Sequence, residues 1–247
     1  MALTFVFGNS GSGKSTYIYR KTVQMAMEEP HRNFYVVVPE QFTMQTQKAL
    51  VGASVHHVIM NIDVVSFERL AYRVFDELGI RNTIMEETGK NLVLRKIAGE
   101  KAQELTVLKG NIRKMGYIGE IKSILSELMQ YDISLDDLKM LLSKLKKDSN
   151  LYYKLSDIAV MYEAFEEYLR EKYVTAEKVL EVLSEAAPES ELLKNAVMVF
   201  DGFTGFTPVQ MKLMHRLMQI CKDLYVTVTM DARENAYEEK GIQESFI

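Results

Sequence analysis

The sequence predicts an α/β protein in which a parallel sheet is interrupted by a large all-helical insertion. Short runs of β-branched and aromatic residues alternate with helical patterns near both ends of the chain, which is typical of βαβ units. Over about residues 80–192 only helical periodicity remains. The predicted organisation is a sheet domain made of residues 1–79 and 193–247, with 80–192 inserted as a helical domain.

Five strands are expected, three before the insertion and two after it. Each of the first three apolar runs is followed by a helical pattern, and a helix over 207–221 separates the last two. The expected strands are 3–7, 34–38, 58–65, 196–200 and 224–230.

Apolar residues inside the insertion recur at alternating steps of three and four. Two such seams predict long neighbouring helices that pack at a shallow angle and form the core of the insertion. The first seam is Ile118, Ile121, Leu125 and Leu128, and the second is Leu151, Leu155, Ile158, Tyr162, Phe165 and Leu169.

The composition excludes several classes of protein. With 247 residues, 47% of them hydrophobic and 26% charged, the chain is not an intrinsically disordered one. Its single cysteine, Cys221, excludes an internal disulfide framework and a Cys-rich metal site, and only four histidines argue against a metal cluster. No apolar run approaches ~20 residues and no signal-peptide pattern is present, so a cytoplasmic protein without a membrane partner is expected. The polar tail at 232–247 suggests the front part of a longer polypeptide.

The net charge of −4 argues against a strongly basic nucleic-acid module. The charge is uneven, however, with a net charge of +5 over 88–122 and of −6 over 132–192. These segments are interpreted either as solvated helix faces or as a phosphate-facing helix beside an acidic face. The basic residues of the first segment are Lys90, Arg95, Lys96, Lys101, Lys109, Arg113, Lys114 and Lys122.

A phosphate-loop motif follows the first expected strand. The segment GNSGSGKS fits G-x-x-x-x-G-K-[ST] at every fixed position and lies between a strand and a helix, as the motif requires. Glycines let backbone N–H groups converge on a phosphate, and the helix N-terminus adds its dipole. Lys14 is expected to reach the β- and γ-phosphates of ATP. The predicted nucleotide-binding residues are Gly8, Asn9, Ser10, Gly11, Ser12, Gly13, Lys14 and Ser15.

An acidic residue at the end of a second strand completes the predicted nucleotide site. Asp201 follows the apolar run at 197–200, and together with the hydroxyl of Ser15 it is expected to hold Mg²⁺. The alternative is a plain strand-end acid. Gly202 stands where a hydrolysing helicase usually places a glutamate, which weakens the case for fast hydrolysis but not for binding.

Three further segments follow the loop in a characteristic order and spacing. They are VVVPEQFT at 36–43, VVSFERLAYRVF at 64–75 and VFDGFTGFTP at 199–208. Together with the loop, they resemble the start of the AddB family, also called RexB. This family supplies one of the two subunits of the bacterial ATP-dependent helicase/deoxyribonuclease that processes DNA double-strand breaks for homologous recombination. The resemblance runs over essentially all 247 residues.

The resemblance implies a P-loop NTPase fold of the RecA-like, superfamily 1 helicase type, with the sheet domain as the 1A-like part and the insertion as the 1B-like part. It implies that the motor role belongs to an AddA/RexA-type helicase subunit in a heterodimer. It further implies that the complex acts on double-stranded DNA and that this part scans single-stranded DNA for the Chi hotspot. The nuclease and its iron–sulfur cluster are expected only in the family's C-terminal part, because such a cluster needs about four thiolates.

Polar and aromatic residues at the expected strand ends suit contacts with single-stranded DNA. Amide and hydroxyl groups can contact phosphates or base edges, while aromatic faces and guanidinium groups can stack on bases. For the aromatic residues, packing between helix and sheet is the alternative. The predicted DNA-binding residues are Gln41, Thr43, Phe67, Arg69, Tyr72 and Phe206.

Two gaps predict that this chain alone binds nucleotide weakly or hydrolyses it negligibly, and it is expected to have no nuclease activity. No glutamine precedes Gly8, although superfamily 1 motors read adenine with one, and a second motor domain is missing from these residues.

Two other functions remain open. A small-molecule P-loop kinase is disfavoured because residues 123–169 contain no arginine for a lid, and the other alternative is a non-enzymatic assembly module with a structural loop.

Overall fold

The computed structural model describes residues 2–55, 57–81, 83–110, 115–147, 149–170 and 173–230. The chain forms two compact units. The first unit is Met1–Arg81 with Leu180–Ile247, and the second unit is Asn82–Val179.

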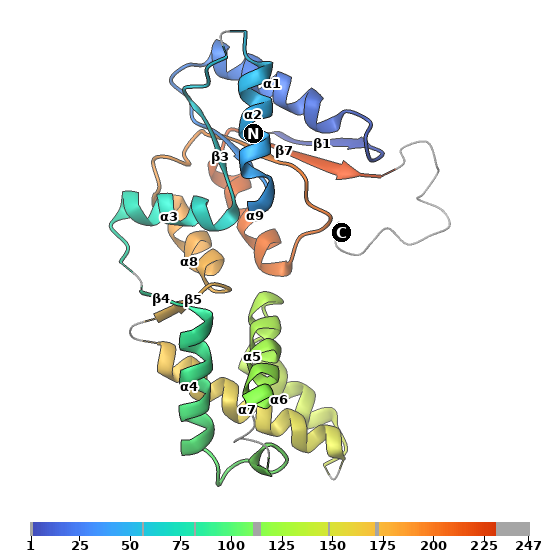
Figure 1. Ribbon diagram of the computed structural model, residues 1–247, viewed down its shortest axis with the longest axis vertical. Helices are drawn as coiled ribbons and strands as arrows, with labels where there is room; N and C mark the ends of the chain where they lie inside the picture. The colour runs from blue at the N-terminus through green and yellow to red at the C-terminus, as the bar shows by residue number, and fades with distance from the viewer. Residues whose placement is uncertain are drawn as a thin grey trace. The chain divides into compact units, whose positions relative to one another are not determined.

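The first unit is built on a sheet of five parallel strands, which confirms the predicted α/β class (Figure 1). The strand order is β1-β7-β6-β2-β3, so β1 lies at an edge and pairs with β7. Gly8 at the end of β1 lies beside Thr229 at the end of β7. The strands are β1 (Ala2–Gly8), β2 (Phe34–Val37), β3 (Ile62–Val65), β6 (Val197–Phe200) and β7 (Asp223–Thr229).

Helices cover both faces of this sheet, and the direction of each crossover decides the face. The chain moves from β1 through β2 to β3 in one direction and returns from β3 through β6 to β7 in the other. Because crossovers between parallel strands are right-handed, α1 and α2 lie on one face and α3, α8 and α9 on the other (Figure 1). The elements are α1 (Lys14–Glu28), η1 (Glu40–Phe42), α2 (Thr43–Ala53), α3 (Phe67–Leu78), α8 (Val179–Ala186), η3 (Ala187–Glu189) and α9 (Pro208–Ile220).

The core under α1 and α2 is a continuous apolar layer. Ile18 and Val23 of α1 and Leu50 of α2 are buried against Val36 and Val199 of the sheet. On the opposite face the edge strand β1 keeps three apolar side chains exposed, at alternate positions as the pleat of a strand requires. These are Leu3, Phe5 and Phe7.

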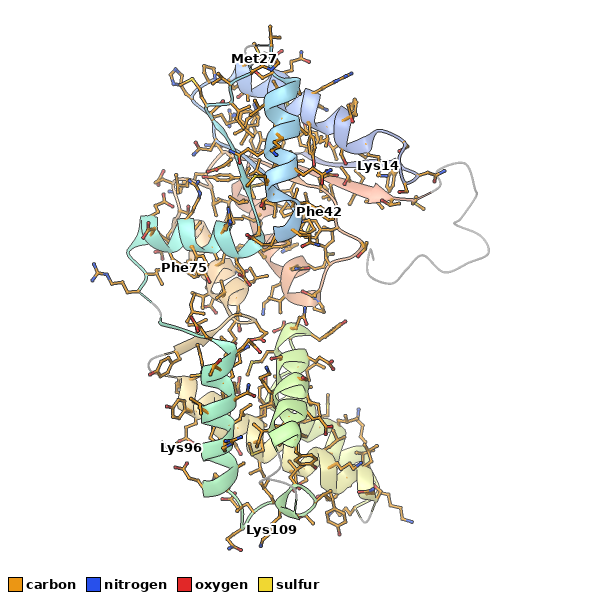
Figure 2. The ribbon with its side chains drawn as sticks, viewed as in Figure 1. Lys14, Met27, Phe42, Phe75, Lys96 and Lys109 are labelled. Atoms are coloured by element: carbon orange, nitrogen blue, oxygen red, sulfur yellow. The ribbon has the colours of Figure 1, made fainter. Side chains whose placement is uncertain are left out.

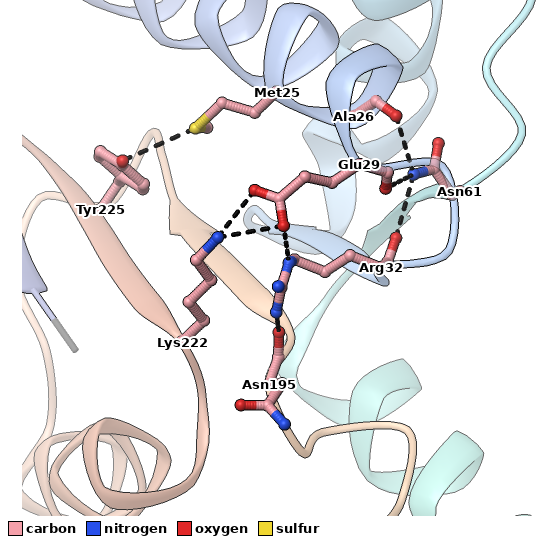
Figure 3. A network of polar contacts seen from close by, with 8 residues as sticks. All are labelled: Met25, Ala26, Glu29, Arg32, Asn61, Asn195, Lys222 and Tyr225. Atoms are coloured by element: carbon pink, nitrogen blue, oxygen red, sulfur yellow. Dashed lines mark hydrogen bonds and ion pairs between the residues drawn. The ribbon is translucent and has the colours of Figure 1, made fainter.

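A polar network ties the C-terminal end of α1 to β6 and β7 (Figure 3). The Lys222 Nζ donates to both carboxylate oxygens of Glu29, at 2.7 and 3.0 Å. The Arg32 guanidinium donates to the same carboxylate and to the carbonyl of Asn195. Lys222 and Arg32 thereby lower the pKa of Glu29. Asn61, just before β3, donates its amide to the carbonyl of Ala26 in the last turn of α1 and to those of Glu29 and Arg32 in the turn that follows. The amino-terminal edge of the sheet is therefore held by side chains as well as by the strand ladder.

The second unit is mainly helical, but the prediction of an all-helical insertion is wrong. Two short parallel strands, β4 (Thr83–Met85) and β5 (Tyr173–Thr175), form a separate sheet. Three residues are too few for an alternating pattern, and the pairing joins distant segments, so periodicity does not reveal it. The helical elements are α4 (Glu87–Glu100), η2 (Leu108–Gly110), α5 (Met115–Gln130), α6 (Leu135–Lys144) and α7 (Asn150–Leu169).

The predicted seams form the core of this unit, with one exception. Ile121 and Leu125 of α5 and Ile158 and Phe165 of α7 are buried in one cluster. Leu151 is 53% exposed because it lies in the first turn of α7, before the helix reaches the core.

Among the described residues of the second unit, Lys90 and Asp157 are buried, and both have charged or hydrogen-bonding partners. The Lys90 Nζ lies 2.7 Å from a carboxylate oxygen of Glu87 and 2.7 Å from one of Glu177. Asp157 of α7 accepts hydrogen bonds from the backbone N–H groups of Thr106, Val107 and Leu108, at 2.7–3.1 Å. The Asp157 carboxylate therefore fixes the loop between α4 and η2, since unpaired buried N–H groups are costly.

The first boundary between the units, after residue 81, lies close to the predicted boundary after residue 79. The second boundary, after residue 179, comes earlier in the chain than the predicted one after residue 192. The prediction assigned residues 180–192 to the insertion, whereas the first unit contains them. Ser190 and the backbone N–H of Leu192 donate to the Glu77 carboxylate at the end of α3, which binds this segment to the sheet domain.

The only cysteine of the sequence gives a direct probe of opening of the first unit. Cys221 is 5% exposed, and burial raises the pKa of its thiol to about 12. At pH 8 a thiol with that pKa is about 10⁻⁴ thiolate, and the thiolate is the reactive form. We expect a disulfide-exchange reagent to react at least ~100-fold more slowly with the native protein than with protein in urea. Stoichiometric labelling of native protein within the mixing time would contradict this burial.

Candidate nucleotide site

The site is built around the glycine-rich loop that joins β1 to α1. A Cβ at Gly8 would lie 2.4 Å from the Ser12 Oγ, so any larger residue there would force the Ser12 side chain to move. Gly11 and Gly13 have φ values of 75° and 89°, in the left-handed region that favours glycine. The Ser12 N–H donates to the Asn9 carbonyl at 3.1 Å and closes the turn. The local conformation therefore accounts for all three glycines of the motif.

Lys14 begins α1 and folds back over this loop (Figure 2). Its Nζ donates to the carbonyls of Gly8 and Asn9, at 2.7 and 2.8 Å. The side chain is only partly buried, so the ammonium group places a positive charge at the mouth of the loop. A cation beside a loop of backbone N–H groups is suited to bind an anion.

Asp201 directly follows β6 and lies against the start of α1, although the two are far apart in sequence. Asp201 is 4% exposed. The Ser15 hydroxyl donates to Oδ1 at 3.2 Å, and the Thr227 hydroxyl of β7 donates to the same oxygen at 2.5 Å. The structure thus brings together the two residues that the sequence predicts as Mg²⁺ ligands.

Tyr19 is a member of this cluster that the sequence analysis missed. Its hydroxyl donates to Oδ2 of Asp201 at 2.5 Å and shares a hydrogen bond with the Thr46 hydroxyl of α2 at 3.2 Å. Burial raises the pKa of Tyr19, and the negative charge of Asp201 raises it further, so the phenol stays protonated. We call Ser15, Tyr19, Thr46, Asp201 and Thr227 the hydroxyl network. Thr227 was detectable as a polar residue within a buried strand, and Tyr19 lies one helical turn after Ser15.

A cavity of about 500 Å³ opens beside the hydroxyl network, between α1 and α2. Arg20 of α1 and Gln45 of α2 give it polar walls, and Asp201 and Gly202 also line it. Its α2 wall carries the small residues Ala49, Gly52 and Ala53.

The chemistry of the donors suits a hard cation better than a transition metal. In the described part of the chain, no group of three or more His, Cys, Asp or Glu side chains could hold a metal ion. Ser15 and Asp201 instead offer a hydroxyl and a carboxylate oxygen, the ligand types that Mg²⁺ uses together with phosphate oxygens and water.

The predicted DNA-binding residues lie at the carboxyl edge of the same sheet, but not all are accessible. Gln41 is exposed in η1, and the Thr43 hydroxyl donates to the Glu40 carbonyl at the start of α2. Arg69 is exposed and forms an ion pair with Glu40 at 3.0 Å, which joins η1 to the start of α3. Tyr72 is 41% exposed on α3.

Phe67 and Phe206 require a correction, because their rings are buried. Phe67 is 7% exposed, with ring centroids of Phe200 and Phe203 at 5.7 and 5.3 Å. Phe206 is 9% exposed and lies 5.1 Å from Phe203. These rings form an aromatic cluster under the loop after β6, so neither Phe67 nor Phe206 presents a face on which a base could stack.

The basic segment of the second unit is largely neutralised in the residues that the structure describes. Lys122 contacts the Glu87 carboxylate at 2.6 Å, and Lys101 contacts Glu104 at 2.9 Å. Arg113 and Lys114 lie outside the described residues. These pairs favour a solvated helix face over a phosphate-binding one. Among the described residues, no helix is long and apolar enough to cross a membrane.

Comparison with known proteins is consistent with this geometry. Residues 5–246 match the family described as "ADDB, N-terminal". A B-type subunit of an ATP-dependent helicase/deoxyribonuclease from Lachnoclostridium phytofermentans is 42% identical over 94% of this chain. Subunits of the same name from Alkaliphilus oremlandii and Clostridium perfringens are 34% and 30% identical over 97% and 100% of it. The chain spans about a fifth of the length of these relatives, 20–21%.

Proposed function

The chain belongs to the AddB N-terminal family, and from this premise we propose that it is the nucleotide-binding part of a helicase/nuclease subunit that processes broken DNA. The observation that carries the proposal is the junction of the glycine-rich loop with Asp201. Lys14 lies over the loop, and the Ser15 hydroxyl contacts the acid at the end of β6. This is the arrangement in which P-loop proteins of RecA-like fold hold ATP. We propose that the first unit is such a 1A-like domain and the second unit its 1B-like insertion.

ATP with Mg²⁺ is the ligand that fits this site. The backbone N–H groups of Gly8–Ser15 would cradle the β-phosphate, and Lys14 would exchange its two loop carbonyls for phosphate oxygens. Ser15 and Asp201 would hold the cation, which neutralises phosphate charge when it is bound.

We further propose that this site binds ATP without hydrolysing it rapidly. Both oxygens of Asp201 already accept hydrogen bonds from protein hydroxyls, and the next residue is Gly202, which cannot activate a water molecule. The nucleotide would then serve a structural or regulatory role in this subunit.

Calorimetry tests the nucleotide proposal directly. ADP and a non-hydrolysable ATP analogue should each bind with 1:1 stoichiometry in the presence of Mg²⁺, and chelation of Mg²⁺ should weaken the binding. If neither nucleotide binds, the loop has only a structural role and the proposal is refuted.

The DNA-scanning role is proposed for the carboxyl edge of the sheet. The relatives are named as one subunit of a larger enzyme, which supports a heterodimer with an AddA/RexA-type helicase subunit and action on double-stranded DNA. Gln41, Arg69 and Tyr72 are accessible there and suit contact with the unwound single strand and recognition of Chi. Because this chain is net acidic, its own affinity for DNA should be weak and salt-sensitive.

We expect Arg69→Ala to weaken binding of single-stranded DNA by the complete enzyme about 5–10-fold, and to weaken its response to Chi, while unwinding persists. The guanidinium would lose a stacking or phosphate contact worth about 1–3 kcal/mol. Loss of the exposed Arg69–Glu40 pair should cost the fold only about 0–1 kcal/mol. Fluorescence anisotropy with labelled single strands measures the first effect, and a thermal melt measures the second.

Arg73→Ala is the matched control. Arg73 lies one turn further along α3 and pairs with Asp63 at 2.8 Å, so its removal costs a similar ion pair on the same helix. Equal loss of DNA affinity in both variants would show a general charge effect and would remove Arg69 from the proposed contact surface.

A further inference from the structure

We propose that Tyr19 is a positioning residue that couples nucleotide occupancy to DNA binding by linking Asp201 to helix α2. The inference rests on the proposed function, because it assigns the route by which that site would influence the strand-binding edge.

The contacts define a continuous path through the first unit. The Tyr19 hydroxyl donates to Oδ2 of Asp201 at 2.5 Å and lies 3.2 Å from the Thr46 hydroxyl. Tyr19 is 8% exposed and Thr46 is 4% exposed, so water does not compete freely for these groups. Buried hydrogen bonds of this kind are costly to break, and each one therefore fixes the position of its partner.

The path begins at the residues that would sense Mg²⁺ and nucleotide. Oδ1 of Asp201 accepts from Ser15 and Thr227, and Oδ2 accepts from Tyr19. A cation held by Ser15 and Asp201 would replace the hydrogen bond between them. The carboxylate would then be oriented by different partners, and the Tyr19 hydroxyl that depends on Oδ2 would be re-oriented with it.

The path ends at the segment that carries the proposed strand contacts. Thr46 lies in the first turn of α2, which follows η1 without a break. Gln41 lies in η1, and Glu40 of the same element forms the ion pair with Arg69. A displacement of Thr46 would therefore move Gln41 and change the position of the Arg69 partner.

The cavity beside α2 provides room for this displacement. It occupies about 500 Å³ between α1 and α2, and its α2 wall consists of Ala49, Gly52 and Ala53 along with the polar Gln45 and Thr46. A close-packed interface would resist a small movement of a helix, whereas a cavity lined by small residues permits it.

The test is a coupling measurement in the full-length subunit with its partner subunit. The affinity for a labelled single strand is measured with and without a Mg²⁺-bound, non-hydrolysable ATP analogue. We expect a change of at least about 5-fold in the wild-type complex, within the range typical of allosteric coupling. In Tyr19→Phe, which keeps the ring but removes the hydroxyl, the ratio of the DNA affinities with and without the ATP analogue should fall to about 1–2. Thr46→Val, which interrupts the path away from Asp201, should reduce the ratio in the same way.

Tyr17→Phe is the matched control, since Tyr17 is an exposed tyrosine on the same helix and should keep the wild-type ratio. Hydrogen exchange gives a second readout, because nucleotide should change protection of residues 43–53 in the wild type but not in Tyr19→Phe. A wild-type ratio retained by both Tyr19→Phe and Thr46→Val overturns the inference. A ratio of 1 in a wild-type complex that binds both ligands also overturns it, without affecting the proposed function. Failure of the wild type to bind nucleotide refutes the proposed function, and the inference falls with it.

Discussion

Replacing Lys14 by alanine should lower the affinity for ADP or ATP at least about 100-fold, so that calorimetry at micromolar protein shows no binding. The Lys14 ammonium is the positive group at the mouth of the loop, and it already lies within 2.7–2.8 Å of two loop carbonyls. A charge-assisted hydrogen bond contributes about 1.5–3 kcal/mol, and this lysine would donate more than one to the phosphates.

Lys48→Ala is the control, because it removes one positive charge from the exposed surface of α2 and leaves the loop intact. Its nucleotide affinity should stay within about 2-fold of wild type, since exposed charges are screened by salt. Nucleotide binding that survived Lys14→Ala unchanged would show that the ligand occupies another part of the molecule.

Asp157→Ala should destabilise the second unit by about 3–4 kcal/mol. Asp157 is 1% exposed and is the shared acceptor of three backbone N–H groups, those of Thr106, Val107 and Leu108. Removal of the carboxylate leaves these donors without a partner in a largely apolar site, and each unsatisfied buried donor costs about 1–3 kcal/mol. Hydrogen exchange of α5 and α7 as a function of urea measures the loss in this unit alone.

Asp136→Ala, in the first turn of α6, is the comparison for loss of an aspartate from the same unit. Asp136 is exposed, and its favourable interaction with the helix dipole contributes about 0.3–1 kcal/mol. Similar destabilisation by the two variants would mean that the Asp157 carboxylate does not hold the loop after α4. Cys221 lies in the first unit, so its rate of labelling should be the same in both variants.

The parts of the fold that could be predicted are those with a local signal. The five strands of the sheet are short apolar runs between helical patterns, and all five are present, although the third is shorter than expected, at Ile62–Val65. The loop at 8–15 was recognisable because the geometry that demands its glycines is contained within eight residues. Asp201 could be predicted for a similar reason, as the first polar residue after a buried strand.

The remaining features depend on contacts that no local pattern encodes. The hydroxyl network joins Tyr19 to Asp201, 182 positions apart, and helical periodicity does not reveal the partner of a tyrosine hydroxyl group. Burial of Phe67 follows from its neighbours Phe200 and Phe203, which reach it only when β3 and β6 flank β2 in the sheet. The β4–β5 pair is likewise formed by two segments on either side of the inserted helices.

The strand order has a consequence for synthesis of the protein on the ribosome. β1 is translated before the second unit, yet the strand it pairs with is β7, which is translated after the whole of that unit. At about 5–20 residues per second, the nascent chain waits on the order of 10–40 s between the appearance of Gly8 and that of Thr229. Throughout that interval the backbone of β1 lacks its partner strand, and an unpaired edge that carries apolar side chains, here Leu3, Phe5 and Phe7, is prone to aggregate. The glycine-rich loop is therefore translated long before its neighbour β7, and shortening the inserted unit should shorten the time for which the nascent chain needs protection.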